Sequence, residues 1–237
     1  MKLTWLAENS PANAFPDISQ ALQEPNGLLA AGGDLSTARL VAAYRRGIFP
    51  WYEDGQPILW WSPEPRAVLF PGNLHVSRSL RRTLRRENYT TSFDRDFAGV
   101  VAGCARDRPG QRGTWITPAM AEAYVELHRQ GYAHSVEVWR DDKLAGGIYG
   151  VSLGRVFYGE SMFSRHTDAS KIALLGLVRR LQAWNFELID CQIPSAHLMS
   201  LGAELIPRER FLAMNRDLAS DAPAVQSWRE EPPGLAL

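Results

Sequence analysis

The stretch FELIDCQIPS, Phe186–Ser195, decides how we expect the fold and the site to be built. Its apolar residues predict a short buried strand, which Asp190 and Gln192 interrupt with polar side chains. Because side chains alternate along a strand, these two polar groups are expected on the same side. An ionised carboxylate in a core costs several kcal/mol unless it is paired or lines a cavity. Asp190 therefore either caps the following turn as a structural group or faces a functional site.

The composition describes a chain that can form a sizeable core and has no overall charge. Of 237 residues, 45% are hydrophobic, and 26 Lys and Arg residues balance 26 Asp and Glu residues. Nucleic-acid binding can therefore come only from a local basic patch. Two cysteines, Cys104 and Cys191, provide neither a disulfide framework nor a zinc set, as is typical of a reducing compartment. Without a leader-like start or an apolar run near about 18 residues, we expect a cytoplasmic protein with no membrane contact.

The chain divides into a turn-rich first part and a second part in which strands and helices alternate. Pro63 and Pro65 interrupt any regular element in WWSPEPR, so the predicted domains are 1–64 and 65–237. Helices that cover a partly antiparallel sheet would give an α+β, or mixed α/β, fold. The expected strands are 65–70, 88–93, 134–139, 144–153, 155–164 and 186–193, and the expected helices are 36–44, 77–87, 117–131 and 172–181.

A further polar residue, Glu160, stands in the apolar, strand-like segment FYGESMFS, residues 157–164. On its own, a single glutamate of this kind is as readily a sheet-edge residue that faces water. Alternatively, Glu160 joins Asp190 and Gln192 from a neighbouring strand beside an apolar cavity. Ligand sites combine apolar walls with a few convergent polar groups in this way. The residue pattern leaves both possibilities open.

Five arginines follow helical spacing in SRSLRRTLRRE, residues 77–87. They lie at positions i, i+3, i+4, i+7 and i+8, so one face of the predicted helix is strongly positive. This face is either an ordinary solvated surface or a surface for phosphate groups, whose contacts give salt-dependent affinity. The five residues are Arg78, Arg81, Arg82, Arg85 and Arg86.

Trp51 and Trp115 lie in short, loop-like segments, FPWY and GTWIT. A rigid loop could present either ring to an unpaired base, where stacking contributes about 1–3 kcal/mol per base. Most tryptophans are instead core anchors, and we expect that role for Trp60 or Trp61.

The sequence lacks the usual cofactor and metal motifs. It has no G-x-x-x-x-G-K-[ST] or G-x-G-x-x-G spacing, and no H-E-x-x-H motif or Cys/His cluster. Its histidines are scattered, so a Ser-His-Asp arrangement is not indicated. We therefore expect no cofactor and no bound metal.

Several short motifs occur in one order between about Glu24 and Arg210. They are EPNGLLAAGGDLS, RRGIFPWY, ILWWSPEPRAVL, GTWIT, AHSVEVW, GGIYGV, GESMFS, ASKIALL and LIDCQ, followed by HLMSLGA. Together they resemble the bacterial leucyl/phenylalanyl-tRNA–protein transferase family. The resemblance implies a small N-terminal domain and a C-terminal domain like acetyltransferases of the GCN5-related type.

The resemblance also implies an activity and its partners. The enzyme would transfer Leu or Phe, and Met more weakly, from Leu-tRNA or Phe-tRNA to the α-amino group of a protein. The acceptors would be proteins or peptides with N-terminal Arg or Lys, which the transfer marks for degradation by the bacterial N-degron route.

Site roles follow from the same resemblance. Asp190 is expected to act as general base with Gln192 in a relay, unless the terminal ribose hydroxyl moves the proton and Asp190 only positions the amine. Glu160 would bind the terminal adenosine or the aminoacyl group. Trp51 would stack on the adenine, with Trp115 and Tyr124 nearby, and the arginine helix would hold the tRNA acceptor stem.

An apolar pocket would accept the Leu or Phe side chain and reject charged or β-branched ones. At positions 148 and 181 the chain has Ile and Leu, where the family can carry Met and Phe, so the preference between Leu and Phe stays open. The expected pocket residues are Ile148, Phe157, Met162, Leu174, Leu181 and Ile189.

Two other functions fit parts of the sequence. An acyl-CoA-dependent N-acyltransferase would share the C-terminal fold, but its phosphate loop, Q/R-x-x-G-x-G/A, is not evident. A non-catalytic tRNA-binding module would explain the arginines and Trp51, yet it leaves Asp190 on an apolar strand unaccounted for.

Overall fold

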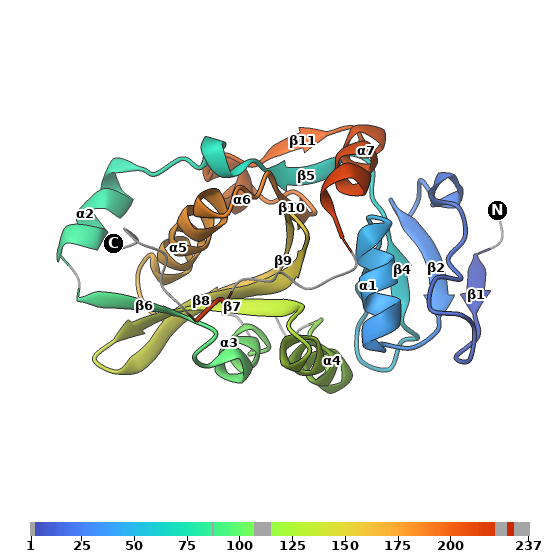
Figure 1. Ribbon diagram of the computed structural model, residues 1–237, viewed down its shortest axis with the longest axis horizontal. Coiled ribbons are helices and arrows are strands. Elements are labelled where there is room, and N and C mark those ends of the chain that lie inside the picture. The colour runs from blue at the N-terminus through green and yellow to red at the C-terminus, as the bar shows by residue number, and fades with distance from the viewer. Residues whose placement is uncertain (1–2, 87, 107–114, 221–226, 230–237) are drawn as a thin grey trace.

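The structure is a computed structural model that describes residues 3–86, 88–106, 115–220 and 227–229 (Figure 1). Its first part forms a four-stranded sheet in the order β1-β2-β4-β3. The sequence analysis does not predict this sheet, because its strands are only two to five residues long and lie between turns. The elements are β1 (Thr4–Leu6), β2 (Leu28–Gly32), β3 (Phe49–Pro50), β4 (Leu59–Trp61), α1 (Thr37–Arg45) and the short 3-10 helix η1 (Ile18–Gln20).

The second part is built on a seven-stranded sheet in the order β11-β5-β10-β9-β8-β7-β6. Strands β6 to β9 pair antiparallel with one another, whereas β10 pairs parallel with β9 and antiparallel with β5. The strands are β5 (Arg66–Leu69), β6 (Tyr89–Phe93), β7 (Ala133–Arg140), β8 (Lys143–Leu153), β9 (Val156–Ser164), β10 (Leu188–Gln192) and β11 (Glu204–Ile206).

Helices cover both faces of this sheet, which confirms the predicted mixed α/β fold (Figure 1). One face carries α5, whose apolar residues share a core cluster with β7 and β8, and the other carries α3 and α4. The sequence analysis does not predict α3, α6, α7 or β11, which are short or lack a clear period. The helices are α2 (Arg78–Arg86), α3 (Phe97–Cys104), α4 (Pro118–Arg129), α5 (Ala169–Ala183), α6 (Ala196–Ser200), α7 (Arg208–Leu218) and the 3-10 helix η2 (Pro71–Asn73).

Local sequence signals explain where the predicted helices begin. The Ser36 hydroxyl accepts a hydrogen bond from the Arg39 amide at the start of α1, and Thr117 does the same for Met120 at the start of α4. Pro118 occupies the first turn of α4, where its missing N–H is not needed. The predicted boundary between residues 64 and 65 falls between the two sheets, and the division into two domains stays a prediction. No helix of the described residues is long and apolar enough to cross a membrane.

Strand β10 departs from the regular alternation that we expected. Its pairing with β5 shifts register between Asp190 and Gln192, and Gln192 has a φ of 63°. The regular alternation behind the prediction that both side chains point the same way is therefore interrupted between Asp190 and Gln192. The bulge turns each polar group toward its own partner, Arg66 or Glu160.

A buried ion pair joins β5 to β10. The Arg66 guanidinium donates to both carboxylate oxygens of Asp190 at 2.8 and 2.7 Å, and both residues are 0% exposed. The guanidinium carbon also lies 4.8 Å from the ring centroid of Phe49 and 4.5 Å from that of Phe211. Arg66 thus touches strand β3 of the first sheet, strand β10 of the second, and helix α7.

Substituting Arg66→Ala should lower the free energy of unfolding by about 3–5 kcal/mol, because it leaves the Asp190 carboxylate buried without its cation. Urea unfolding curves measure this difference. The matched control is Arg155→Ala, which removes an ion pair between half-exposed Arg155 and Glu187 and should cost no more than about 1 kcal/mol. Equal losses for the two variants would contradict the structural role assigned to Arg66.

Candidate active site

An apolar cavity of about 230 Å³ lies where β9 and β10 meet the segment after β3. Its walls are mainly aliphatic and aromatic, and Glu160 and Gln192 provide polar groups at one edge. The cavity therefore has the composition of a small-molecule site. Its lining residues are Phe49, Pro50, Trp51, Trp115, Ile148, Gly159, Glu160, Ser161, Met162, Leu174, Ile189, Cys191, Gln192, Ile193 and Leu198.

Four of the six expected pocket residues line this cavity: Ile148, Met162, Leu174 and Ile189. The other two, Phe157 and Leu181, are not among its lining residues. Leu181 is fully buried and lies seven residues beyond Leu174 on α5, which is about 10 Å further along the helix. Phe157 is also buried, and its ring packs against that of Trp228 with centroids 5.9 Å apart. Both residues belong to the core behind the cavity.

The two tryptophans predicted to be functional both line the cavity. Trp51 is 40% exposed, and its carbonyl accepts a hydrogen bond of 2.6 Å from the indole N–H of Trp61. Trp115 stands on the same cavity and is partly buried. Trp60 is 0% exposed in the core, as expected for one of the neighbouring pair.

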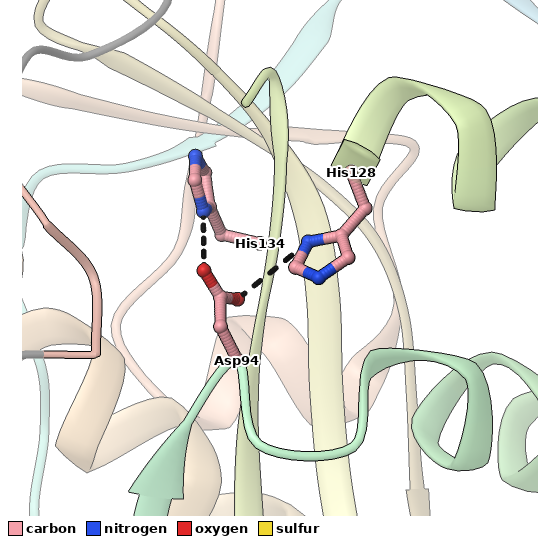
Figure 2. Close-up of side chains that lie close together, drawn as sticks. All are labelled: Asp94, His128 and His134. Atoms are coloured by element: carbon pink, nitrogen blue, oxygen red, sulfur yellow. Dashed lines mark hydrogen bonds and ion pairs between the residues drawn. The ribbon is translucent and has the colours of Figure 1, made fainter. Parts of the chain in front are cut away.

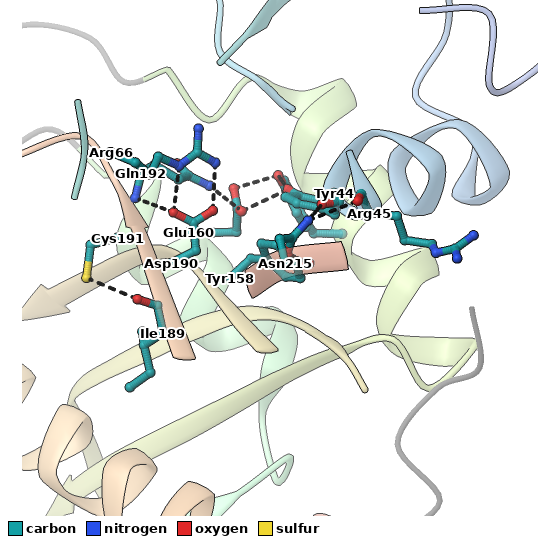
Figure 3. A network of polar contacts seen from close by, with 11 residues as sticks. Tyr44, Arg45, Arg66, Tyr158, Glu160, Ile189, Asp190, Cys191, Gln192 and Asn215 are labelled. Carbon is teal, nitrogen blue, oxygen red and sulfur yellow. Dashed lines mark hydrogen bonds and ion pairs between the residues drawn. The ribbon is translucent and has the colours of Figure 1, made fainter. Parts of the chain in front are cut away.

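Glu160 is the centre of a buried polar network (Figure 3). Its Oε1 atom accepts hydrogen bonds of 2.8 Å from the Tyr44 hydroxyl and from Nε2 of Gln192, and its Oε2 atom accepts one of 2.6 Å from the Tyr124 hydroxyl. The two hydroxyl oxygens lie 2.6 Å apart. The sequence analysis had placed Tyr124 near Glu160 but missed Tyr44, whose only signal was a hydroxyl within the predicted helix 36–44.

Burial controls the protonation of this network. Desolvation raises the pKa of Glu160 from its ordinary value of 4.5 to about 7, against the hydrogen bonds from Tyr124 and Tyr44, which lower it. Desolvation, and then the charge of Glu160, raises the pKa of Tyr44 and of Tyr124 well above 10. The phenols therefore remain hydrogen-bond donors at neutral pH, whereas Glu160 changes its charge in that range.

Asp190 does not line the cavity. Besides pairing with Arg66, its Oδ1 atom accepts a hydrogen bond of 2.9 Å from the backbone N–H of Gln192. These contacts match the expected structural alternative, a carboxylate that caps the following turn. The general-base role of Asp190 stays a prediction.

A second, larger hollow adjoins the cavity and has a basic character. The two share five lining residues, and the hollow adds the exposed arginines Arg106 and Arg165. Burial, and then the charge of Lys171, lowers the pKa of His197, which also lines it. The hollow is lined by Gly103, Arg106, Trp115, Glu160, Ser161, Met162, Phe163, Ser164, Arg165, Ser170, Ser195, His197 and Leu198.

The five arginines lie on α2, as their spacing predicts, and the expected last residue of that helix, Glu87, lies outside the described residues. All five are exposed and surround one hollow, and no ion pair joins them to another described residue. Leu80 is buried beneath them, and the Thr83 hydroxyl donates to Asp168 at 2.9 Å. Figure 1 shows α2 at the end of the molecule opposite the first sheet.

Asp94, His128 and His134 form the one described cluster with the residue types of a metal site (Figure 2). Hydrogen-bonding partners lie at three of its four ring nitrogens: Nδ1 of His134 is 2.7 Å from Asp94, Nε2 of His134 is 3.1 Å from the Gly131 carbonyl, and Nδ1 of His128 is 2.8 Å from the Ala133 carbonyl. Nδ1 of His128 is 4.0 Å from Asp94. A metal ion would have to replace these hydrogen bonds, so the geometry favours a structural polar cluster.

Comparison with known proteins identifies the class to which this site belongs. The family model described as leucyl/phenylalanyl-tRNA protein transferase matches residues 68–216, and the model for its N-terminal domain matches residues 33–64. The protein is therefore an enzyme, a tRNA-dependent aminoacyltransferase.

Individual relatives give the same result. The leucyl/phenylalanyl-tRNA–protein transferase of Pseudomonas syringae pv. syringae (strain B728a) is 58% identical over 223 residues, 93% of this chain and 96% of that protein. The enzyme of that name from Methylococcus capsulatus (strain ATCC 33009 / NCIMB 11132 / Bath) is 54% identical over 230 residues, 97% of this chain and 98% of that protein. The chain belongs to the leucyl/phenylalanyl-tRNA protein transferase family.

Similar solved structures include two acetyltransferases. The ribosomal-protein-alanine N-acetyltransferase from Brucella melitensis biovar Abortus 2308 is 14% identical, with a TM-score of 0.36 over 46% of this chain and 82% of that one. A GCN5-related N-acetyltransferase from Kribbella flavida is 12% identical, with a TM-score of 0.34 over 70% of this chain and 59% of that one.

The raised pKa of Glu160 makes folding stability depend on pH. Below about pH 4.5 both the folded and the unfolded states hold the proton, and as pH rises toward about 7 only the folded state keeps it. Relative to Glu160→Gln, wild type should therefore lose stability on the order of 3 kcal/mol between pH 4.5 and 7.

Urea unfolding curves of wild type and Glu160→Gln at half-unit pH intervals measure this loss. The control is Glu122→Gln on the exposed side of α4, which should follow the pH dependence of wild type. A constant difference between wild type and Glu160→Gln across this range would show that burial does not perturb Glu160.

Proposed function

We propose that this enzyme transfers Leu or Phe, and Met more weakly, from aminoacyl-tRNA to the α-amino group of N-terminal Arg or Lys of proteins. The modified protein is then a substrate for the bacterial N-degron route. The observation that carries the proposal is an apolar cavity that opens beside a basic hollow, in a chain of the leucyl/phenylalanyl-tRNA protein transferase family. The enzyme acts in the cytoplasm, where aminoacyl-tRNA is made.

The apolar cavity receives the amino acid of the aminoacyl-tRNA. Its deep wall consists of Ile148, Met162, Leu174 and Ile189, without a charged group that could hold a polar side chain. Met162 is flexible and polarisable, so it can adapt to a branched aliphatic or a flat aromatic side chain. Trp51 and Trp115 stand on the same cavity and are suited to stack on the terminal adenine.

The basic hollow gives the tRNA a route from the cavity toward α2. Arg106 and Arg165 lie along it, and Ser170 lies where α5 begins. The side chain of Thr83 on α2 is hydrogen-bonded to Asp168, directly before α5. Contacts between these cations and tRNA phosphates would add binding affinity without reading the bases. The enzyme would therefore select its aminoacyl-tRNA by the amino acid and the 3′ end.

The reaction is aminolysis of an ester, in which the acceptor's neutral α-amine attacks the aminoacyl carbonyl. Holding the two reactants in near-attack geometry can itself lower the barrier by about 7–11 kcal/mol. We assign Gln192 to this positioning, since it lines the cavity and holds Glu160. Asp190 has two possible roles. It acts as the general base, or the ribose hydroxyl carries the proton and Asp190 only holds the backbone of Gln192 in place.

Transfer of labelled leucine from Leu-tRNA to a peptide with N-terminal Arg tests the proposed function. We expect transfer to peptides that begin with Arg or Lys and none to the same peptide when its α-amine is acetylated, because no nucleophile remains. Phe-tRNA should compete with Leu-tRNA, whereas Val-tRNA should not. Transfer from acetyl-CoA in place of Leu-tRNA would favour an acyl-CoA-dependent enzyme, and tRNA binding without any transfer would favour a binding module.

Substituting Arg82→Gln on α2 should weaken binding of Leu-tRNA and lower the slope of log affinity against log salt by about 1, as expected for one lost phosphate contact. Filter binding at several salt concentrations measures both changes. The control is Arg129→Gln, which removes the same charge from α4, where Arg129 is 72% exposed. An unchanged slope for Arg82→Gln would remove α2 from the tRNA-binding surface.

A further inference from the structure

The side chains of Glu160, Tyr44 and Tyr124 form a closed ring of hydrogen bonds. The number of protons in this ring depends on whether Glu160 is ionised. The three side chains are linked by O···O contacts of 2.8, 2.6 and 2.6 Å, each short enough to be a hydrogen bond. Two phenols supply only two protons, and an ionised carboxylate supplies none. A proton in all three contacts therefore requires the carboxylic acid form of Glu160. The geometry is that of a ring which has already accepted one proton.

The ring can also exist with one proton fewer. When Glu160 is ionised, both phenols donate to its oxygens, and Gln192 donates to Oε1. A carboxylate offers about four acceptor positions, and these three bonds from described residues leave one of them, on Oε2. After a proton binds at that position, the O–H of the carboxylic acid can rotate toward Tyr124 while Tyr124 turns its own proton to Tyr44, and Tyr44 continues to donate to Oε1. No buried phenol loses its partner in either form, so the ring can take up a proton without a large desolvation cost.

Glu160 has the access to substrate that Asp190 lacks. It lines both the apolar cavity and the basic hollow, whereas Asp190 lines neither and is 0% exposed. Both oxygens of Asp190 accept hydrogen bonds from Arg66, and one also accepts the backbone N–H of Gln192. A proton on Asp190 would have to compete with that guanidinium.

On these observations, and given the proposed aminoacyl transfer, we infer that Glu160 takes the proton from the attacking amine, with Tyr44 and Tyr124 as positioning residues. The amine nitrogen forms the C–N bond to the aminoacyl carbonyl carbon, and one of its protons passes to Oε2 of Glu160. The C–O bond to the terminal ribose then breaks with its electron pair on the ribose oxygen. Glu160 returns its proton to that oxygen, so that atoms and charge balance and the ring is reset.

The surroundings of the ring agree with a proton acceptor that works near neutral pH. Desolvation, and after it the nearby charge of Asp190, raises the pKa of Glu160 to about 7, against the hydrogen bonds from Tyr124, Tyr44 and Gln192, which lower it. Two other buried groups nearby stay neutral, since burial raises the pKa of Tyr149 on β8 well above 10 and that of the Cys191 thiol on β10 above its usual range. The charged groups on the hollow that Glu160 lines are Arg106 and Arg165, and His197 lines it too. A base with a pKa near the working pH gives the most effective proton transfer.

The pH dependence of kcat/KM for the acceptor peptide tests this inference, with Leu-tRNA saturating. In wild type both the amine and Glu160 must lose a proton, so log kcat/KM should rise with a slope of about two at low pH. In Glu160→Gln only the amine titrates, so the slope should fall to about one, and the rate constant should drop by roughly 10²–10⁴-fold. Glu160→Asp should recover part of the rate and the steeper slope.

Two tyrosine variants distinguish a role of the ring in proton transfer from the loss of any buried hydroxyl. Tyr44→Phe removes a donor to the carboxylate, so the acidic limb of the profile should move to higher pH while the protein stays folded. Tyr158→Phe is the matched control: it removes a buried hydroxyl from the same strand as Glu160, but one that donates to Asn215 at 2.6 Å. Its acidic limb should coincide with that of wild type.

The following outcomes would contradict the role of Glu160 or the proposed transfer. A slope of about two in Glu160→Gln, or transfer as fast as in wild type, would overturn the inference. So would a slope of about one in Asp190→Asn, measured on protein that urea unfolding shows to be folded, because Asp190 would then be the base. Absence of transfer in wild type would instead refute the proposed aminoacyl transfer itself.

Discussion

The ion pair between Arg66 and Asp190 is the interaction on which the rest of the structure depends. Two charges removed from water stabilise a fold only when their geometry and remaining hydrogen bonds are nearly complete. Here the guanidinium meets both carboxylate oxygens and lies between the rings of Phe49 and Phe211. One side chain thus ties the first sheet, the central strand β10 and helix α7 together. The strand bulges directly after Asp190, and beyond the bulge the side chain of Gln192 donates to Glu160.

The site is made by the meeting of the two sheets. The turn-rich first part supplies Phe49, Pro50 and Trp51 to the cavity wall and Tyr44 to the Glu160 network. The second part supplies the aliphatic floor and Glu160 itself. Asn215 on α7 secures the junction, since its side chain donates to the carbonyl oxygens of Tyr44 and Arg45 at 3.0 and 2.9 Å (Figure 3). Neither part alone would form a closed site.

Charge is distributed unevenly between the apolar cavity and the surfaces beside it. The apolar cavity carries one carboxyl group, Glu160, whose pKa burial raises to about 7, whereas exposed arginines line the hollow beside it and helix α2. The net charge of zero does not reveal this uneven distribution, because acidic residues elsewhere in the chain balance the arginines. Salt should therefore affect tRNA binding much more than the chemical step.

The sequence by itself determined the features that depend on local periodicity. These are the main helices and strands of the second part and the arginine stripe of α2, whereas the residue pattern left open whether Glu160 faces water or an apolar cavity. Only the tertiary structure decided which polar groups are partners. Arg66 and Asp190 are separated by 124 positions in the chain, and Tyr44 and Glu160 by 116. No local pattern encodes pairs at such separations, because they form only when the strands and the two sheets pack together.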